Sequence, residues 1–332
     1  MRKVILIAVL ALIPMSFAQA QMPTEEREAL IALYNSTDGP NWTNNTNWLG
    51  AVGTECTWCG VYCSLDDQVT QLILPTNKLN GSLPPEIGDL PILFLLHMWA
   101  NQLSGSIPPE LEDLSGLVNL HLHLNQLTGS IPPELGQLAL LQQLYLYSNK
   151  LRGDIPAELE DLTALLDGSG LRMKWNALHS DNATLIAFLD GKSPGGEWQS
   201  TQTIAPVNLT FDRVGDHTVW LSWDSVSYLG DSGGYEVFYA PTGSGVWSSG
   251  GWTEDKEDIT FPVTGLDPGT IYDLAVVTYT DPHDFNQNLV PSDFSLEVMP
   301  TTASAGCPQP IVQQTEEDPI TLSLSESFDS YV

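Results

Sequence analysis

The sequence predicts an α/β solenoid of about five stacked coils with a short parallel sheet, followed by an all-β sandwich. Asn77, Asn101, Asn125 and Asn149 recur every 24 residues, and each begins nearly the same phrase. A fixed period of this length is typical of coils that stack to bury a shared core. After residue 203 the repeat disappears, and about seven short runs alternate apolar and polar residues, a pattern that favours two packed antiparallel sheets.

Length and charge narrow the classes of function. The chain has 332 residues, which suggests about two domains. It carries 11 Lys plus Arg against 41 Asp plus Glu, for a formal charge of −30. Phosphate groups would be repelled by such a chain, so nucleic acid and anionic membranes are excluded as main partners.

Residues 1–20 have the organisation of a signal peptide. Arg2 and Lys3 precede an apolar stretch that is too short to span a bilayer comfortably, and Ala18 and Ala20 form a small-x-small cleavage signal. We expect cleavage after Ala20 and a protein that is secreted or held at the cell surface. No later run is apolar and long enough to predict a membrane span.

Each repeat unit shows how one coil is built. Two apolar residues separated by one residue mark a short strand with one face inward. A buried Asn can then satisfy the backbone where the chain leaves the strand. The apolar pairs are Leu72 with Leu74, Leu96 with Met98, Leu120 with Leu122, Leu144 with Leu146 and, in a fifth unit, Leu171 with Met173. Asn176 of the fifth unit comes three residues late, which indicates an insertion around residues 167–169.

The phrase Asn125-Gln-Leu-Thr-Gly-Ser-Ile-Pro and its copies resemble the plant-type leucine-rich repeat, L-x-x-N-x-L-x-G-x-I-P. The resemblance implies an amino-terminal cap at 21–68, repeats at 69–179, and a closing cap with linker at 180–202 that contains a helix over 183–189. The family pairs the positions of Cys56 and Cys63, so a disulfide is expected there. Cys59 departs from the family pattern, and it is either free or paired with Cys307.

Residues 203–302 resemble a fibronectin type III domain. Val219, Leu221 and Trp223 alternate on one strand face, with Trp223 as the core tryptophan and Tyr272 as the corner tyrosine that this resemblance implies. The loop 280–293 is longer than a typical hairpin connection and is a weaker candidate for partner binding. Residues 303–332 are expected to be an acidic tail or the beginning of a truncated further domain.

The outward residues of the repeat strands form the candidate ligand site, which we name the concave face. The face consists of His97, Trp99, His121, His123, Tyr145, Tyr147, Arg172, Lys174 and Trp175. Solvated strands do not need aromatic rings in adjacent columns, and such rings give large contact areas at low entropic cost. We expect an extracellular protein or peptide ligand, because this face is the usual recognition surface of the family. A glycan that stacks on the rings is the alternative. Cross-strand stacking that only stabilises the sheet is a further explanation, which we favour less than binding.

An enzymatic interpretation rests on His97, His121 and His123, which are close enough on neighbouring strands to suggest a zinc-dependent hydrolase. It is disfavoured because no carboxylate on these strands can serve as base or orient a ligand. The sequence contains no nucleophile elbow, zinc-protease motif, phosphate-binding loop or dinucleotide fingerprint. We therefore expect a non-enzymatic recognition protein without cofactor or metal, or, as a third class, a structural stalk.

Overall fold

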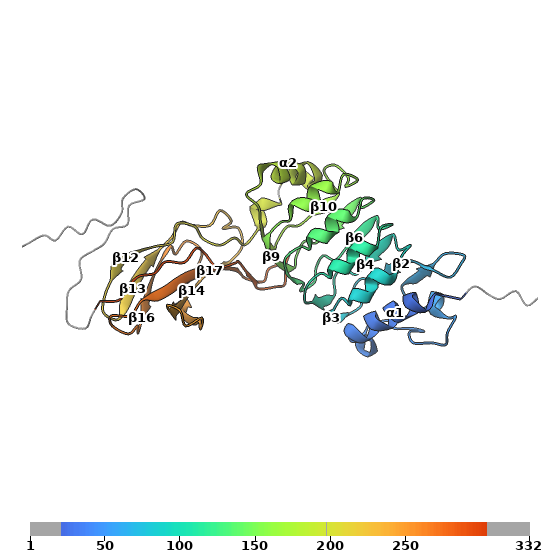
Figure 1. Cartoon of the computed structure of the whole chain (residues 1–332), viewed down its shortest axis with the longest axis horizontal. Coiled ribbons are helices and arrows are strands. Elements are labelled where there is room, and N and C mark those ends of the chain that lie inside the picture. The colour runs from blue at the N-terminus through green and yellow to red at the C-terminus, as the bar shows by residue number, and fades with distance from the viewer. Residues whose placement is uncertain (1–20, 197, 304–332) are drawn as a thin grey trace, which may run out of the picture.

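The computed structural model describes residues 21–196 and 198–303, which form a curved stack of coils with a β-sandwich beside its last coils (Figure 1). The helix α1 (Thr24–Ser36) lies at one end of the stack and α2 (Ala183–Lys192) at the other. The expected signal peptide, Cys307 and the acidic tail from residue 304 onward lie outside the described residues. Within the part of the chain that the structure describes, no helix combines the length and apolar character needed to cross a bilayer.

The solenoid is built on a six-stranded sheet in the order β1-β2-β4-β6-β8-β10. These strands are β1 (Val61–Cys63), β2 (Val69–Ile73), β4 (Leu95–His97), β6 (Asn119–His121), β8 (Gln143–Tyr145) and β10 (Leu171–Arg172). All pairs after β1–β2 are parallel, and Leu72, Leu96, Leu120, Leu144 and Leu171 lie in one register. The predicted parallel sheet of stacked coils is therefore confirmed, and the late fifth unit is accommodated by a turn at 167–169.

The return side of each coil contains a short strand and a 3₁₀ helix. The strands are β3 (Asn80–Ser82), β5 (Gln102–Ser104), β7 (Thr128–Gly129), β9 (Lys150–Asp154) and β11 (Ala177–His179). The 3₁₀ helices are η3 (Pro85–Asp89), η4 (Pro109–Asp113), η5 (Pro133–Gln137) and η6 (Ala157–Asp161). A proline precedes every one of them, and three also begin with proline, which is tolerated there because the N–H groups of a first helical turn have no partner within the helix.

A ladder of buried amides holds successive coils together. Asn149 has no exposed surface; its Oδ1 accepts from the backbone N–H of Leu127, and its Nδ2 donates to the carbonyls of Leu122 and Leu146. At the last position of the ladder a glutamine replaces the asparagine, and the side chain of Gln202 accepts from the backbone N–H of Leu178. The side chain thus satisfies backbone groups that neither water nor a strand partner reaches.

Both ends of the solenoid are covered. At the amino-terminal end a disulfide joins Cys56 and Cys63 as the family resemblance implies, and Cys59 is free among the described cysteines. At the other end α2, whose first turn is capped by Asn182, continues to Lys192 and is therefore longer than the predicted 183–189. The Lys192 ammonium contacts Asp167 at 2.6 Å and so ties α2 to the inserted turn.

The sandwich consists of a three-stranded sheet, β12-β13-β16, and a four-stranded sheet, β15-β14-β17-β18. Its strands are β12 (Thr210–Val214), β13 (Thr218–Ser222), β14 (Gly233–Pro241), β15 (Ser248–Trp252), β16 (Thr260–Thr264), β17 (Tyr272–Thr280) and β18 (Val290–Pro291). Trp223 lies in the core with its ring edge against Tyr235, and the Tyr272 hydroxyl accepts a hydrogen bond from the Asp267 N–H. Both tryptophan and tyrosine therefore occupy the positions that the resemblance predicts.

The sandwich contacts the solenoid through the loop between β17 and β18. Asn286 Nδ2 donates to the carbonyls of Asn149 and Trp175 at 3.1 and 2.8 Å, and Asn288 Nδ2 donates to the carbonyl of Asn125 at 2.7 Å. Both asparagines are buried. The long loop, a weak candidate for partner binding in the sequence, is thus fastened to the edge of the repeats.

Candidate ligand-binding surface

The parallel register places the predicted concave-face residues in two columns. The first column runs from His97 through His121 and Tyr145 to Arg172. The second contains Trp99, His123, Tyr147 and Lys174. The backbone carbonyls of His123, Tyr147 and Lys174 accept hydrogen bonds from the N–H groups of Ala100, Leu124 and Ser148, each on the preceding coil. The first four strands repeat every 24 residues and the fifth follows after 27, and the common register makes equivalent positions in each coil face the same side.

Rings in the first column stack face to face. The ring centroids of His97 and His121 are 4.1 Å apart with an interplanar angle of 1°, and those of His121 and Tyr145 are 4.3 Å apart. The Arg172 guanidinium lies 4.9 Å from the Tyr145 ring, within the range of a cation–π contact. The column therefore ends on a cation that rests on an aromatic ring.

The second column continues from the solenoid onto the sandwich. The His123 ring stacks on Trp99 at 5.6 Å and on Tyr147 at 4.4 Å. Tyr147 meets the edge of Trp175 at 6.3 Å, and Trp175 stacks on Phe285 of the sandwich loop at 4.9 Å. Phe285 extends the line of rings beyond the last repeat.

Burial keeps the histidines of this face neutral. Desolvation, aided by neighbouring cationic groups, lowers the pKa of His121 to about 4 and that of His123 to about 3. The pKa of His97 is also lowered by burial. Near neutral pH the formal charges on the concave face are therefore those of Arg172 and Lys174.

Acid should destabilise the solenoid through these histidines. Between about pH 7 and pH 5 the unfolded chain takes up protons at His121 and His123, whose ordinary pKa is near 6.5, while the folded chain does not. Stability is therefore expected to fall as pH decreases through this interval, before most carboxylates titrate. Urea unfolding at both pH values measures the loss, and the double variant His121→Asn/His123→Asn should lose less. An equal loss in both proteins would contradict this assignment.

The histidines do not form a metal site. The rings of His97 and His121 are parallel, so their in-plane lone pairs cannot converge on one ion. Among the described residues no group of three or more His, Cys, Asp or Glu side chains is arranged to hold a metal. The geometry therefore gives the zinc-hydrolase alternative no support.

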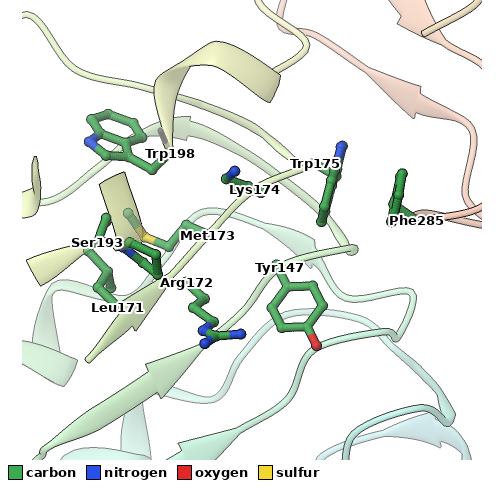
Figure 2. Close-up of a pocket in the computed structure, with 10 residues that line it drawn as sticks. Tyr147, Leu171, Arg172, Met173, Lys174, Trp175, Ser193, Trp198 and Phe285 are labelled. Carbon is green, nitrogen blue, oxygen red and sulfur yellow. The ribbon is translucent and has the colours of Figure 1, made fainter. Parts of the chain in front are cut away.

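A cavity of about 380 Å³ opens where the last coil, the closing cap and the sandwich loop meet. Its walls are Tyr147, Leu171, Arg172, Met173, Lys174, Trp175, Ser193, Pro194, Trp198 and Phe285. Figure 2 shows Trp175 and Phe285 side by side at one end and Arg172 reaching toward Tyr147. Four of the predicted ligand-site residues thus share one hollow, whereas His97, Trp99, His121, His123 and Tyr145 lie outside it.

Sequence reasoning missed Phe285 and the cap residues of this cavity. Trp198 of the closing cap is buried and forms part of the cavity wall. Phe285 lies in the long loop that was noted only for its length. A phenylalanine within the mostly polar stretch 281–288 was the available signal.

Comparison with known families agrees with this architecture. The model for the fibronectin type III domain matches residues 204–287, and the leucine-rich-repeat model matches residues 116–138 and 140–162. The chain is therefore a repeat protein joined to an immunoglobulin-like sandwich. More specifically, it is a plant-type leucine-rich-repeat protein with a C-terminal fibronectin type III domain.

Similar proteins come from Arabidopsis thaliana. Leucine-rich repeat protein 2 is 40% identical over 94 residues, which are 28% of this chain and 40% of that protein. A probable inactive leucine-rich repeat receptor-like protein kinase is 35% identical over 74 residues, 22% of this chain and 11% of the kinase. The matched region thus spans less than half of either relative. The crystal structure of the BIR2 ectodomain is 28% identical, with 51% of this chain and 91% of that chain covered and a TM-score of 0.45.

Proposed function

We propose that this protein is a secreted or cell-surface recognition protein, without enzymatic activity, that binds a protein or peptide on the concave face. The observation that carries the proposal is the pair of aromatic columns, whose side chains do not contribute to the hydrophobic core. Leu96, Leu120 and Leu144 fill the core from the opposite side of the same strands. The kinship of the repeats with a receptor-like protein kinase supports a recognition role outside the cell.

The stacked rings suit a binding surface because they are already ordered. The rings of Trp99, His123 and Tyr147 each stack on a ring of the next strand, so little side-chain entropy is lost when a ligand binds. A purely structural stalk would not need such preordered rings on an outward face.

A glycan is less well suited to this surface than a peptide. Sugars bind aromatic residues by lying flat on a ring face, yet the faces of His121 and His123 are covered by rings on both sides. The ring edges that remain favour extended chains with mixed apolar and polar groups. Peptides and glycans are therefore both included in the binding experiment, with the peptide expected to bind.

Replacing Trp99 or Tyr147 by alanine should weaken binding by about 2 kcal/mol or more, because central aromatic anchors dominate interface energetics. The purified full chain is first screened against peptide, extracellular-protein and glycan arrays, and the best ligand is then titrated by calorimetry. Thermal melting should change little, since neither side chain belongs to the core.

The matched controls are Glu110→Gln, Glu134→Gln and Glu158→Gln on the return side, which should alter neither binding nor melting. Loss of binding in these controls, with none in Trp99→Ala or Tyr147→Ala, would move the site off the concave face. A ligand found only on the glycan array would replace the peptide in this proposal.

A further inference from the structure

Phe285 is an exposed aromatic ring on a loop that is not free to move. The side chain keeps 60% of its surface exposed, although its ring stacks on Trp175. The next residue, Asn286, is buried and donates to two carbonyls of the solenoid, and Asn288 donates to a third. The Ser148 hydroxyl also donates to the Phe285 carbonyl. Rigid fixation of an exposed ring is a feature of a preorganised contact surface.

The hydrogen bonds of the loop between β17 and β18 follow the spacing of the solenoid coils. Asn288 contacts the coil of Asn125, and Asn286 contacts the coils of Asn149 and Trp175, so alternate loop residues meet consecutive coils. The sandwich is therefore set in one position beside the last coils, and Phe285 has a defined place in the cavity wall.

The charge of the cavity is opposite to that of the protein. Arg172 and Lys174 line it, and none of its ten lining residues is Asp or Glu. The whole chain carries a formal charge of −30. A local cationic site on a strongly acidic molecule attracts an anionic group only at that place and repels it elsewhere.

We propose that the solenoid and the sandwich together form one anchoring subsite for an acidic peptide, in which Phe285 and Trp175 contact an apolar side chain and Arg172 contacts a neighbouring carboxylate. The inference rests on the proposed function and adds to it the acidic character of the ligand. It also assigns a direct binding role to the fibronectin domain. Guanidinium and ammonium groups are the usual partners of carboxylates, and aromatic walls provide the adjoining apolar contact.

The test is a selection of random short peptides on the full chain, followed by calorimetric titration of the enriched peptides. We expect the enriched sequences to hold an acidic residue next to an apolar one. Phe285→Ala and Arg172→Gln should each weaken binding about tenfold or more, as for other interface anchors. Replacing the peptide's acidic residue by its amide should cost affinity for the native protein but little for Arg172→Gln, because the two changes remove the same contact.

Matched controls are available within the chain. Phe294→Ala removes another half-exposed phenylalanine of the sandwich, which contacts Phe238 and Trp247 instead of the cavity. Arg213→Gln removes an arginine that lies over Trp220. Both variants should bind the selected peptides as tightly as the native protein, within about twofold.

The outcomes separate this inference from the proposed function. If enriched peptides lose affinity with Trp99→Ala or Tyr147→Ala but not with Phe285→Ala or Arg172→Gln, the junction subsite is refuted and the concave-face proposal stands. Enrichment of basic or uncharged peptides also refutes the subsite. If no peptide is enriched, or none of these variants matters, both the subsite and the peptide-binding function are refuted.

Discussion

Replacing Asn149 by alanine should lower the free energy of unfolding of the solenoid by roughly 2–6 kcal/mol. The buried Leu127 N–H is left without a partner, which costs about 1–3 kcal/mol, and two further hydrogen bonds of about 0.5–1.5 kcal/mol each are lost. The carbonyls of Leu122 and Leu146 each keep one donor, Asn125 and Asn176 respectively. The Asn149 side chain accepts one backbone hydrogen bond and donates two, and water cannot replace it because the residue has no exposed surface. The loss is therefore expected to exceed that of removing an ordinary surface amide. Denaturant unfolding of the full chain, followed by circular dichroism, measures it.

Asn80→Ala is the matched control for this change. Asn80 lies in β3 of the first coil with an exposed side chain, so the same chemical change should cost less than about 1 kcal/mol. Equal effects at both positions would show that the buried amide ladder does not hold the coils together. The same comparison also tests the repeat logic, because one broken rung weakens the contact between two coils.

Trp223→Ala should destabilise the sandwich by about 3–5 kcal/mol, the usual cost of removing a large aromatic side chain from a core. The ring is only 3% exposed and its neighbour is Tyr235 on the facing sheet. Hydrogen exchange followed by mass spectrometry localises the effect. Exchange should become faster in β13, β14 and β17, while the six-stranded sheet of the solenoid keeps its protection.

Trp252 provides the control within the same domain. Its side chain is 52% exposed on β15, where it lies against Tyr279, so Trp252→Ala should cost under about 1 kcal/mol. A loss at Trp252 as large as that at Trp223 would show that the core tryptophan has no special role. Spread of fast exchange into the repeats would show that the two domains unfold as one unit.

The candidate site was partly predictable because the repeat fixes which residues of each strand face outward. Once Leu120 and Leu122 are assigned to the core, His121 and His123 must point outward, and the period of 24 residues places Tyr145 and Tyr147 beside them. The strand periodicity alone carries this inference. Face-to-face stacking of the histidines, and hence the weakness of the zinc alternative, required the orientation of the rings about their side-chain torsions. Periodicity contains no information on that orientation.

The sequence by itself determined the two architectures, the apolar core and the outward columns, and the family resemblance added the position of the cap disulfide. The solenoid contacts join residues at equivalent positions one period apart, so a pattern visible along the chain specifies them. Only the tertiary structure decided that Phe285 meets Trp175 and that Asn286 bonds to the carbonyl of Trp175, 111 residues earlier. Such contacts depend on the complementary shapes of two separately patterned domains, which no local periodicity encodes. Tertiary docking therefore created the cavity at their junction.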